Sequence, residues 1–314
     1  MAKAAGQIIH VSQELGGKTL GAVLKQKLRV SWGEAEMRVF ERRVAVHGNL
    51  CLDPARRLKT GDVVNLLDTP AAKPKEAKDL DIVYQDRDVV VVDKPAGIVS
   101  VREPRESKMS RERRERQPTL DELLTKRLSR PHDRGKTIFP VHRLDRDTSG
   151  LMIFARNAGA ERELIRRFQA HDIDRVYAAV TRNGPPPRRT ANTLIVRDRG
   201  DGKRGSLKPG QSDERAQRAI THVQPSGNIG ELGLVECRLE TGRTHQIRIH
   251  LSELGHPICG DKLYGSGKEA DPPPRQALHA RFLGFAHPKT GQPLFFERDW
   301  PADLADWLYP NRRR

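Results

Sequence analysis

Hydrophobic and polar residues near the start of the chain follow the period of an α-helix. In KTLGAVLKQKL (18–28) the apolar side chains recur on one helical face. Ser31 and Glu34 then form a capping-box pattern at the start of WGEAEMRVFERR (32–43). We therefore expect two short helices here, the second with a basic end.

The next part of the chain changes to the alternation typical of β-strands. VAVHGNLCL (44–52) and LKTGDVVNLL (58–67) each alternate around a turn signal, which predicts a small hairpin. Helices followed by a hairpin predict a compact α+β module at residues 1–68. The polar, lysine-bearing stretch 69–79 has no periodicity, so we interpret it as a linker.

The rest of the chain, 80–314, mixes apolar strands and amphipathic helices in irregular order. The expected strands are DVVVVDKP (88–95), GLMIFAR (150–156), RVYAAVT (175–181) and GLVECRLE (233–240). The expected helices are TLDELLTKRL (119–128), GAERELIRRFQ (159–169) and THQIRIHLSELG (244–255). Because regular βαβ alternation is missing, we predict an α+β domain with a mixed, mainly antiparallel sheet. Two charged stretches, 102–117 and 198–216, are interpreted as exposed loops.

The charge balance narrows the class of partner. The 314 residues carry 57 Lys and Arg against 41 Asp and Glu, a formal net charge of +16. Such an excess suits a polyanion, either nucleic acid or an acidic membrane surface. No apolar run is long enough to span a bilayer, and the N-terminus lacks a signal-peptide pattern. We therefore expect a cytoplasmic protein whose polyanionic partner is nucleic acid and not a membrane.

The sequence offers little for metal or cofactor chemistry. Its three cysteines are isolated, so we expect them to be reduced and mostly buried. His245 and His250 lie five positions apart on a predicted helix and do not share a face. Phosphate-binding, dinucleotide-binding and serine-hydrolase motifs are absent. We expect neither a metal nor a cofactor.

The stretch VHRLDRDTSG (141–150) concentrates charge just before an apolar strand. Such a strand end can present a side chain to a substrate. On local features alone, however, Asp145 or Asp147 capping a turn is the better interpretation, and Arg143 would be a surface charge.

Four further stretches change this balance. They are VVVVDKPAGIVSV, RVYAAVT, LETGRTHQIRIHLSELGHPICGDKLYG and QALHARFLGFAHPKTGQPLFF. Together with HRLDRDTSG, these stretches closely resemble, in their residues and in their order along the chain, the motifs of the RluA-like family of RNA pseudouridine synthases. The resemblance covers nearly all of 80–300. The N-terminal module resembles the alpha-L, or ribosomal-protein-S-four-like, RNA-binding domain, a usual companion in that family.

The resemblance implies a pseudouridine synthase fold with a central cleft and an isomerase that needs no cofactor. It places the catalytic aspartate at Asp145, the tyrosine beside the target base at Tyr177 and the active-site arginine at Arg248. Arg143 would fill the gap that the flipped base leaves. We also assign His142 and His245 to RNA binding; orienting Arg248 and capping its helix are the alternative roles for His245. Lys94 and Pro95 are expected to shape a turn, while Asp261 and Tyr264 are expected to serve packing and turn formation.

These residue types suit the breaking of a ribose–base bond. An ionised carboxylate can trap the positive sugar covalently or remove a proton from its neighbouring carbon, and the sequence leaves both routes open. A guanidinium nearby keeps that carboxylate ionised. The phenol of Tyr177 is one candidate acceptor for the proton that the base finally loses.

Several alternatives to the main interpretation stay open. Large-subunit ribosomal RNA is the expected substrate, by analogy with relatives that carry this N-terminal module, and transfer RNA is the rival. A non-catalytic RNA-binding or ribosome-assembly factor and a nucleic-acid glycosidase are the other functions considered. We expect a monomer.

Overall fold

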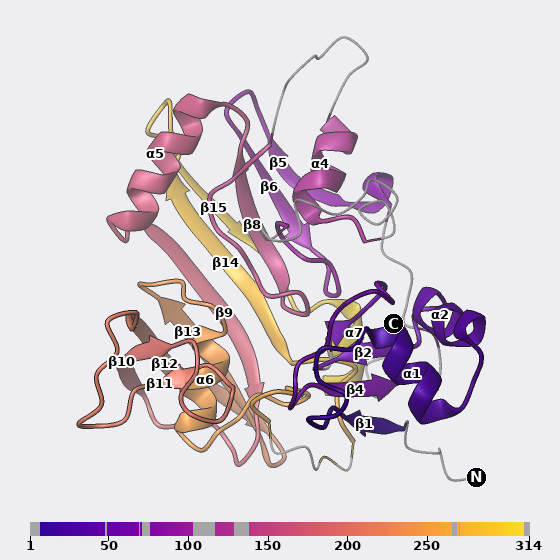
Figure 1. Ribbon diagram of the computed structural model, residues 1–314. Coiled ribbons are helices and arrows are strands. Elements are labelled where there is room, and N and C mark those ends of the chain that lie inside the picture. The colour runs from indigo at the N-terminus through magenta and orange to yellow at the C-terminus, as the bar shows by residue number, and fades with distance from the viewer. Residues whose placement is uncertain are drawn as a thin grey trace. The chain divides into compact units, whose positions relative to one another are not determined.

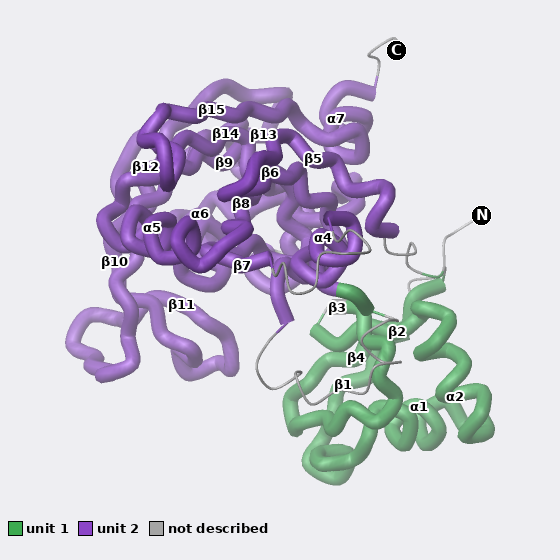
Figure 2. The backbone as a smooth tube through the Cα atoms, turned by 90° about the horizontal axis from the view of Figure 1, so that it is seen from above, with its two compact units in different colours: residues 1–74, 103–118 green, residues 75–102, 119–314 purple. Residues whose placement is uncertain are grey.

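The computed structural model describes residues 7–47, 49–68, 70, 76–102, 117–128, 138–265, 269 and 271–310. The chain divides into two compact units, which Figure 2 colours separately: residues 1–74 with 103–118, and residues 75–102 with 119–314. Most of the predicted loop 102–117 lies outside the described residues, as do residues 69 and 71–75 of the predicted linker.

The smaller unit contains the predicted helices and hairpin. Its elements are β1 (Ile8–His10), α1 (Leu20–Leu28), α2 (Trp32–Phe40), β2 (Val44–Val46), β3 (Asn49–Leu50) and β4 (Val63–Leu66). The Thr19 hydroxyl accepts a hydrogen bond from the Ala22 N–H and so starts α1. Ser31 and Glu34 complete both halves of the predicted capping box at α2.

One strand of this unit was not predicted. β1 pairs antiparallel with β4 in a four-stranded sheet of order β1-β4-β2-β3. With three residues, β1 is too short to show an alternating pattern, and its partner is distant in sequence. Only that pairing defines it as a strand.

The larger unit is built on an 11-stranded sheet (Figure 1). Its strands are β5 (Asp81–Gln85), β6 (Val89–Lys94), β7 (Phe139–Pro140), β8 (Ser149–Ala155), β9 (Ile173–Thr181), β10 (Arg189–Val196), β11 (Gly205–Ser206), β12 (Gln217–Ile229), β13 (Leu232–Leu239), β14 (Leu278–Ala286) and β15 (Pro293–Glu297). Its helices are η1 (Ala77–Asp79), α4 (Leu120–Leu128), α5 (Ala158–Gln169), α6 (Gln246–Glu253) and α7 (Ala302–Leu308). The predicted linker therefore ends in a short 3-10 helix.

The order of the main sheet is β11-β10-β12-β13-β9-β14-β8-β6-β5, with β15 added beside β14 and β7 beside β8. All described pairs are antiparallel except β14 with β8. The prediction of an α+β fold with a mixed, mainly antiparallel sheet is confirmed.

The apolar run of β6 reflects the burial of this strand on both faces of the sheet. Val90 and Val92 belong to the main core, whereas Val89 and Val91 belong to a second core on the opposite face with residues of α5. A strand that is covered on both faces has no polar side to alternate with. The continuous run VVVV is therefore the expected signature of its position.

The predicted exposed loop 198–216 is partly ordered by pairing. β11 lies within it and pairs with the end of β10. The Asp198 carboxylate also accepts hydrogen bonds from the N–H groups of Gly200 and Gly202. The prediction of an irregular loop is thus wrong for β11, because a two-residue strand leaves no periodic signal.

Gly150 allows the one parallel pair of strands that the structure describes in this sheet. Its φ is +116°, and a Cβ placed there would lie 2.3 Å from the Ala280 carbonyl oxygen. Gly150 and Ala280 are register partners in the β8–β14 pair. The glycine that ends VHRLDRDTSG is therefore required by backbone packing.

We predict that Gly150→Ala lowers the free energy of unfolding by about 3 kcal/mol or more, because backbone atoms of β14 must move. Chemical denaturation measures this loss. Gly291→Ala is the matched control: Gly291 also has positive φ, +72°, but a Cβ there meets nothing within 4 Å. The control should lose only about 1–2 kcal/mol. Equal losses in both variants would contradict the steric argument.

Candidate active site

A cavity of about 480 Å³ opens in the larger unit. Its walls come from the segment before β8, from β9, and from the turn that joins β13 to α6. The cavity is lined by all six residues that the sequence assigned to catalysis or RNA binding: His142, Arg143, Asp145, Tyr177, His245 and Arg248. Side chains that lie far apart in the sequence thus meet at one cavity.

A buried lysine holds the backbone of the Asp145 segment. Lys94 is fully buried, and its Nζ donates to the carbonyl oxygens of Pro95, Arg146 and Thr148 at 2.8–3.0 Å. Three acceptors match the three donors of an ammonium group. Burial lowers the pKa of Lys94 to about 7, while the nearby Asp147 acts to raise it. The expected turn-shaping role of Lys94 therefore operates through the loop that carries Asp145.

A serine fixes the residue just before Asp145. The Ser100 hydroxyl donates to the Leu144 carbonyl at 2.7 Å and accepts from the Leu144 N–H at 3.0 Å. The backbone of Leu144 is therefore satisfied on both sides, as buried polar groups require. Asp145 follows a residue whose position is fully determined.

Thr148 and Ser149 are held by a distant segment. The Gln276 side chain donates to the Thr148 hydroxyl at 2.7 Å, and Arg275 Nη2 donates to the Ser149 hydroxyl at 3.0 Å. Arg275 also donates to the Asp147 carbonyl oxygen. The sequence gives no sign of this role of Arg275, because Asp147 and Ser149 lie more than 120 positions away from it.

Arg248 links two carboxylates. Its Nη1 lies 3.2 Å from Asp145 Oδ2, while its Nε and Nη2 lie 2.6 and 2.9 Å from the two oxygens of Asp261. Burial disfavours the charge on Arg248, but both carboxylates stabilise it and raise its pKa. Arg248 therefore stays cationic beside Asp145 at any working pH.

Asp261 has a larger role than the packing expected of it. Its side chain is fully buried, yet hydrogen bonds from Arg248 hold its pKa below the usual value against the effect of burial. The N–H groups of Leu263 and Tyr264 also donate to its Oδ1. The available signal was chemical: a buried arginine facing Asp145 needs a second anion to hold it in place.

His245 acts on Arg248 only indirectly. Its Nδ1 lies 3.0 Å from the Tyr264 hydroxyl, and the Tyr264 ring lies 5.2 Å from Arg248 Cζ. His245 occupies the N-cap position of α6 with φ +62°, and its side chain makes no capping bond. The geometry supports positioning through Tyr264, and the predicted RNA contact of His245 stays a prediction.

Tyr177 forms an apolar wall of the cavity. It lies on β9, paired with Cys237 of β13 and Ala280 of β14, and it is 6% exposed. Burial raises the pKa of its phenol, so the group stays protonated at neutral pH. A protonated phenol is a poor proton acceptor. This favours a role for Tyr177 in contacting the uracil ring rather than in removing its proton.

His142 and Arg143 differ in their surroundings. His142 Nε2 accepts a hydrogen bond from the Ile153 N–H at 3.1 Å, and its ring stacks on Phe168. Burial lowers the pKa of His142 to about 3, so its imidazole is neutral. Arg143 is exposed at the cavity. An exposed guanidinium suits a contact with RNA better than the internally bonded His142 does.

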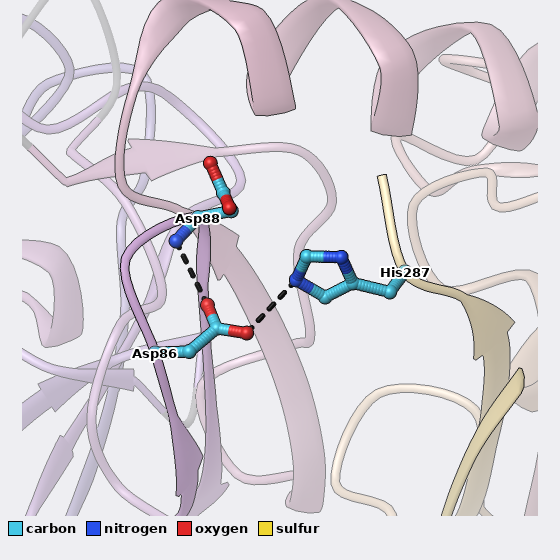
Figure 3. Close-up of side chains that lie close together, drawn as sticks. All are labelled: Asp86, Asp88 and His287. Carbon is cyan, nitrogen blue, oxygen red and sulfur yellow. Dashed lines mark hydrogen bonds and ion pairs between the residues drawn. The ribbon is translucent and has the colours of Figure 1, made fainter. Parts of the chain in front are cut away.

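A second group of polar side chains lies away from this cavity, where Asp86, Asp88 and His287 come together (Figure 3). Asp86 already accepts hydrogen bonds from the N–H groups of Asp88 and Val89, and its other oxygen faces His287 Nε2 at 2.8 Å. His287 Nδ1 accepts from the Thr290 N–H. These bonds join the β5–β6 turn to the end of β14, which gives the cluster a structural role.

Within the described part of the chain, no helix combines the length and apolar character needed to cross a lipid bilayer.

Comparisons with known proteins decide the family. The model of the RNA pseudouridylate synthase family matches residues 88–253. Ribosomal large subunit pseudouridine synthase D of Zymomonas mobilis is 34% identical, over 82% of this chain and 81% of that protein. The chain belongs to the RNA pseudouridylate synthase family. It is an RNA pseudouridine synthase, an isomerase.

Two further relatives extend the likeness. The uncharacterized RNA pseudouridine synthase YhcT of Bacillus subtilis is 33% identical over 97% of both chains. The solved structure of human RNA pseudouridylate synthase domain containing 1 aligns with a TM-score of 0.56 at 27% identity, covering 73% of this chain and 87% of that one. The family resemblance inferred from the sequence motifs is confirmed.

We predict that Asp261→Asn in this synthase lowers the free energy of unfolding by about 3 kcal/mol, because Arg248 is left buried with one carboxylate. Pseudouridine formation should fall as well, since Arg248 is no longer held beside Asp145. Asp174→Asn is the control, because its pair with Arg238 is exposed and worth at most about 1 kcal/mol. Unfolding curves that match between the two variants would refute this role.

The neutral state of His142 predicts an acid sensitivity. Its folded pKa of about 3 lies below the ordinary 6.5, so the unfolded chain binds the additional proton between these values. Stability that is present above pH 6.5 should be lost as the pH falls toward 3.

We predict that stability falls less steeply between pH 7 and 5 in His142→Gln, whose amide oxygen can still accept a hydrogen bond from Ile153. The slope of the unfolding free energy against pH should correspond to about one proton fewer taken up on unfolding. His222→Gln changes a histidine whose side chain is 41% exposed and is the control. An unaltered pH dependence in His142→Gln would show that this imidazole is not the group responsible.

Proposed function

We propose that this synthase converts specific uridines of large-subunit ribosomal RNA to pseudouridine, with Asp145 as its catalytic carboxylate. The observation that carries the assignment of Asp145 is its contact with Arg248, 3.2 Å away, inside a cavity that Tyr177 also lines. The RNA class follows from the relatives named ribosomal large subunit pseudouridine synthase D. The net charge of +16 suits the same substrate.

The arrangement of charges fits the chemistry of the sugar. When the bond between ribose and uracil breaks, positive charge develops at the anomeric carbon. Two partly exposed carboxylates line the cavity: Glu240 is paired with His222, whereas Asp145 faces Arg248. Asp261 behind Arg248 is fully enclosed by its hydrogen bonds. Asp145 is thus the group that can attack the anomeric carbon or take a proton from the adjacent one. Both routes remain possible with this geometry.

The other cavity residues fit the handling of the base. Tyr177 offers an aromatic surface against which the detached uracil can rotate without leaving. Arg143, exposed at the cavity, has the planar cation that can fill the place of a flipped base in the RNA stack. Extraction of the base costs a few kcal/mol, which such a substitute partly offsets.

We further propose that the smaller unit is an RNA-binding module of the ribosomal-protein-S-four-like type. Its order of two helices followed by short strands supports this assignment, as do the basic residues in the last turns of α1 and α2. RNA binding through such groups should weaken steeply as the salt concentration rises.

The test is to map pseudouridine in total RNA from cells that lack the protein and are supplied with wild-type, Asp145→Asn or Asp147→Asn chains. Asp145→Asn should reduce the rate by at least about 10³-fold, because the nucleophile or base is lost. Asp147→Asn is the matched control, since Asp147 lies in the same loop and its backbone carbonyl is the group bound by Arg275.

Each outcome of the mapping has a defined meaning. Loss of pseudouridine at positions of large-subunit ribosomal RNA supports the proposal, and loss in transfer RNA would reassign the substrate. Full activity of Asp145→Asn would remove it as the catalyst. Binding of RNA without any modification would favour a non-catalytic assembly factor, and release of free uracil would favour a glycosidase.

A further inference from the structure

The cavity contains a second buried guanidinium that the mechanism above does not use. Arg175 lies on β9 two positions before Tyr177, which places both side chains on one face of the strand. It is 6% exposed and lines the cavity. Its Cζ lies 5.2 Å from the ring centre of Phe168.

Arg175 is held by the protein but its charge is not balanced there. Nη2 donates to the carbonyl oxygens of Glu240 and Leu239, at 2.8 and 3.4 Å. Nε is buried without a hydrogen-bond partner, and the described residues provide no carboxylate in contact with this guanidinium. Burial accordingly lowers the pKa of Arg175, against an opposing effect from Tyr177.

The contrast with Arg248 indicates what is missing. These are the two arginines that are buried in the described part of the chain, and Arg248 contacts two carboxylates. A buried charge without a counter-charge is costly unless a ligand supplies one. Arg175 is therefore a cation inside a substrate cavity, and a bound ligand would have to supply its counter-charge.

The position of the Nη1 atom indicates where that anion would bind. Nη1 lies 3.0 Å from the point that a Cβ on Gly242 would occupy. Gly242 is exposed, lines the cavity and precedes the exposed Arg243. The unused donor thus lies beside a bare stretch of backbone at the solvent edge of the cavity. When a nucleotide is flipped, its base enters the active-site pocket, which leaves the flanking backbone phosphates nearer to the solvent edge.

We propose that Arg175 binds a phosphate that flanks the flipped uridine, with Gly242 leaving room for that phosphate at Nη1. This inference rests on the proposed function, because it needs an RNA substrate in the cavity. A phosphate is anionic throughout the reaction, so it balances Arg175 as soon as RNA binds. The site would thereby fix the sugar relative to Asp145.

The test uses a synthetic RNA hairpin that contains a uridine which the wild-type enzyme converts to pseudouridine. Copies carry one neutral methylphosphonate on the 5′ or the 3′ side of that uridine. Dissociation constants and single-turnover rates are measured for wild-type and Arg175→Met. Wild-type should bind one of the two modified RNAs roughly tenfold more weakly, as expected for loss of a charge-assisted hydrogen bond.

The losses of binding free energy caused by the methylphosphonate and by Arg175→Met should not be additive. Arg175→Met should bind the unmodified RNA roughly tenfold more weakly, and the sensitive methylphosphonate should then cost this variant almost nothing. Arg238→Met, which removes an exposed arginine of the neighbouring β13, is the control and should keep the full sensitivity of wild-type. Additive losses, or a slower reaction with unchanged phosphate sensitivity, would overturn the proposal.

A second variant keeps the test valid if Arg175→Met does not fold. Gly242→Ala retains the guanidinium but crowds Nη1, so it should reduce the same phosphate sensitivity. If neither methylphosphonate weakens binding by wild-type, the proposal fails regardless of any variant. Failure in an RNA that wild-type modifies concerns Arg175 alone, whereas a wild-type enzyme that modifies no RNA overturns the proposed function together with this inference.

Discussion

The geometry of the cavity depends on one guanidinium shared unequally between two carboxylates. Arg248 makes two short bonds to Asp261, at 2.6 and 2.9 Å, and one longer bond to Asp145, at 3.2 Å. The bidentate pair fixes the plane of the guanidinium whether or not Asp145 is engaged elsewhere. Asp145 can therefore leave its contact with Arg248 while the cation stays in place. Holding the cation and meeting the substrate are tasks of different residues.

A buried lysine performs the equivalent task for the backbone. Lys94 binds the carbonyl oxygens of Arg146 and Thr148, which follow Asp145. Ser100 fixes Leu144, which precedes it. A flexible chain that ends in three donors suits several carbonyls that converge from a loop, whereas the planar fork of arginine suits carboxylates. Lys94 thus sets where the loop runs, and Arg248 sets how the Asp145 side chain is directed.

Sequence could predict those features that depend on neighbouring residues. The capping box of Ser31 and Glu34, the doubly buried strand β6 and the helix end at Gly255 each have a local cause, and each is present in the structure. The sequence motifs were also sufficient to predict the family. Asp261, Arg275 and the clamp by Lys94 could not be found in this way, because they depend on contacts between segments that only the sheet brings together. The periodicity of a sequence does not indicate which distant carboxylate pairs with a buried arginine.

The cavity carries charges of opposite sign at different parts of its wall. Arg248, Asp145 and Asp261 together carry one excess negative charge, and it lies where the sugar becomes positive during the proposed reaction. Arg175, beside the exposed Gly242, contributes an unbalanced positive charge at another part of the wall. A nucleotide has the complementary arrangement, with a permanent anion at its phosphate and a cation that develops only at its anomeric carbon. Because the enzyme's charges are fixed by packing before RNA arrives, the nucleotide is oriented by its own chemistry on entry, and the carboxylate that reacts is the one that faces the sugar.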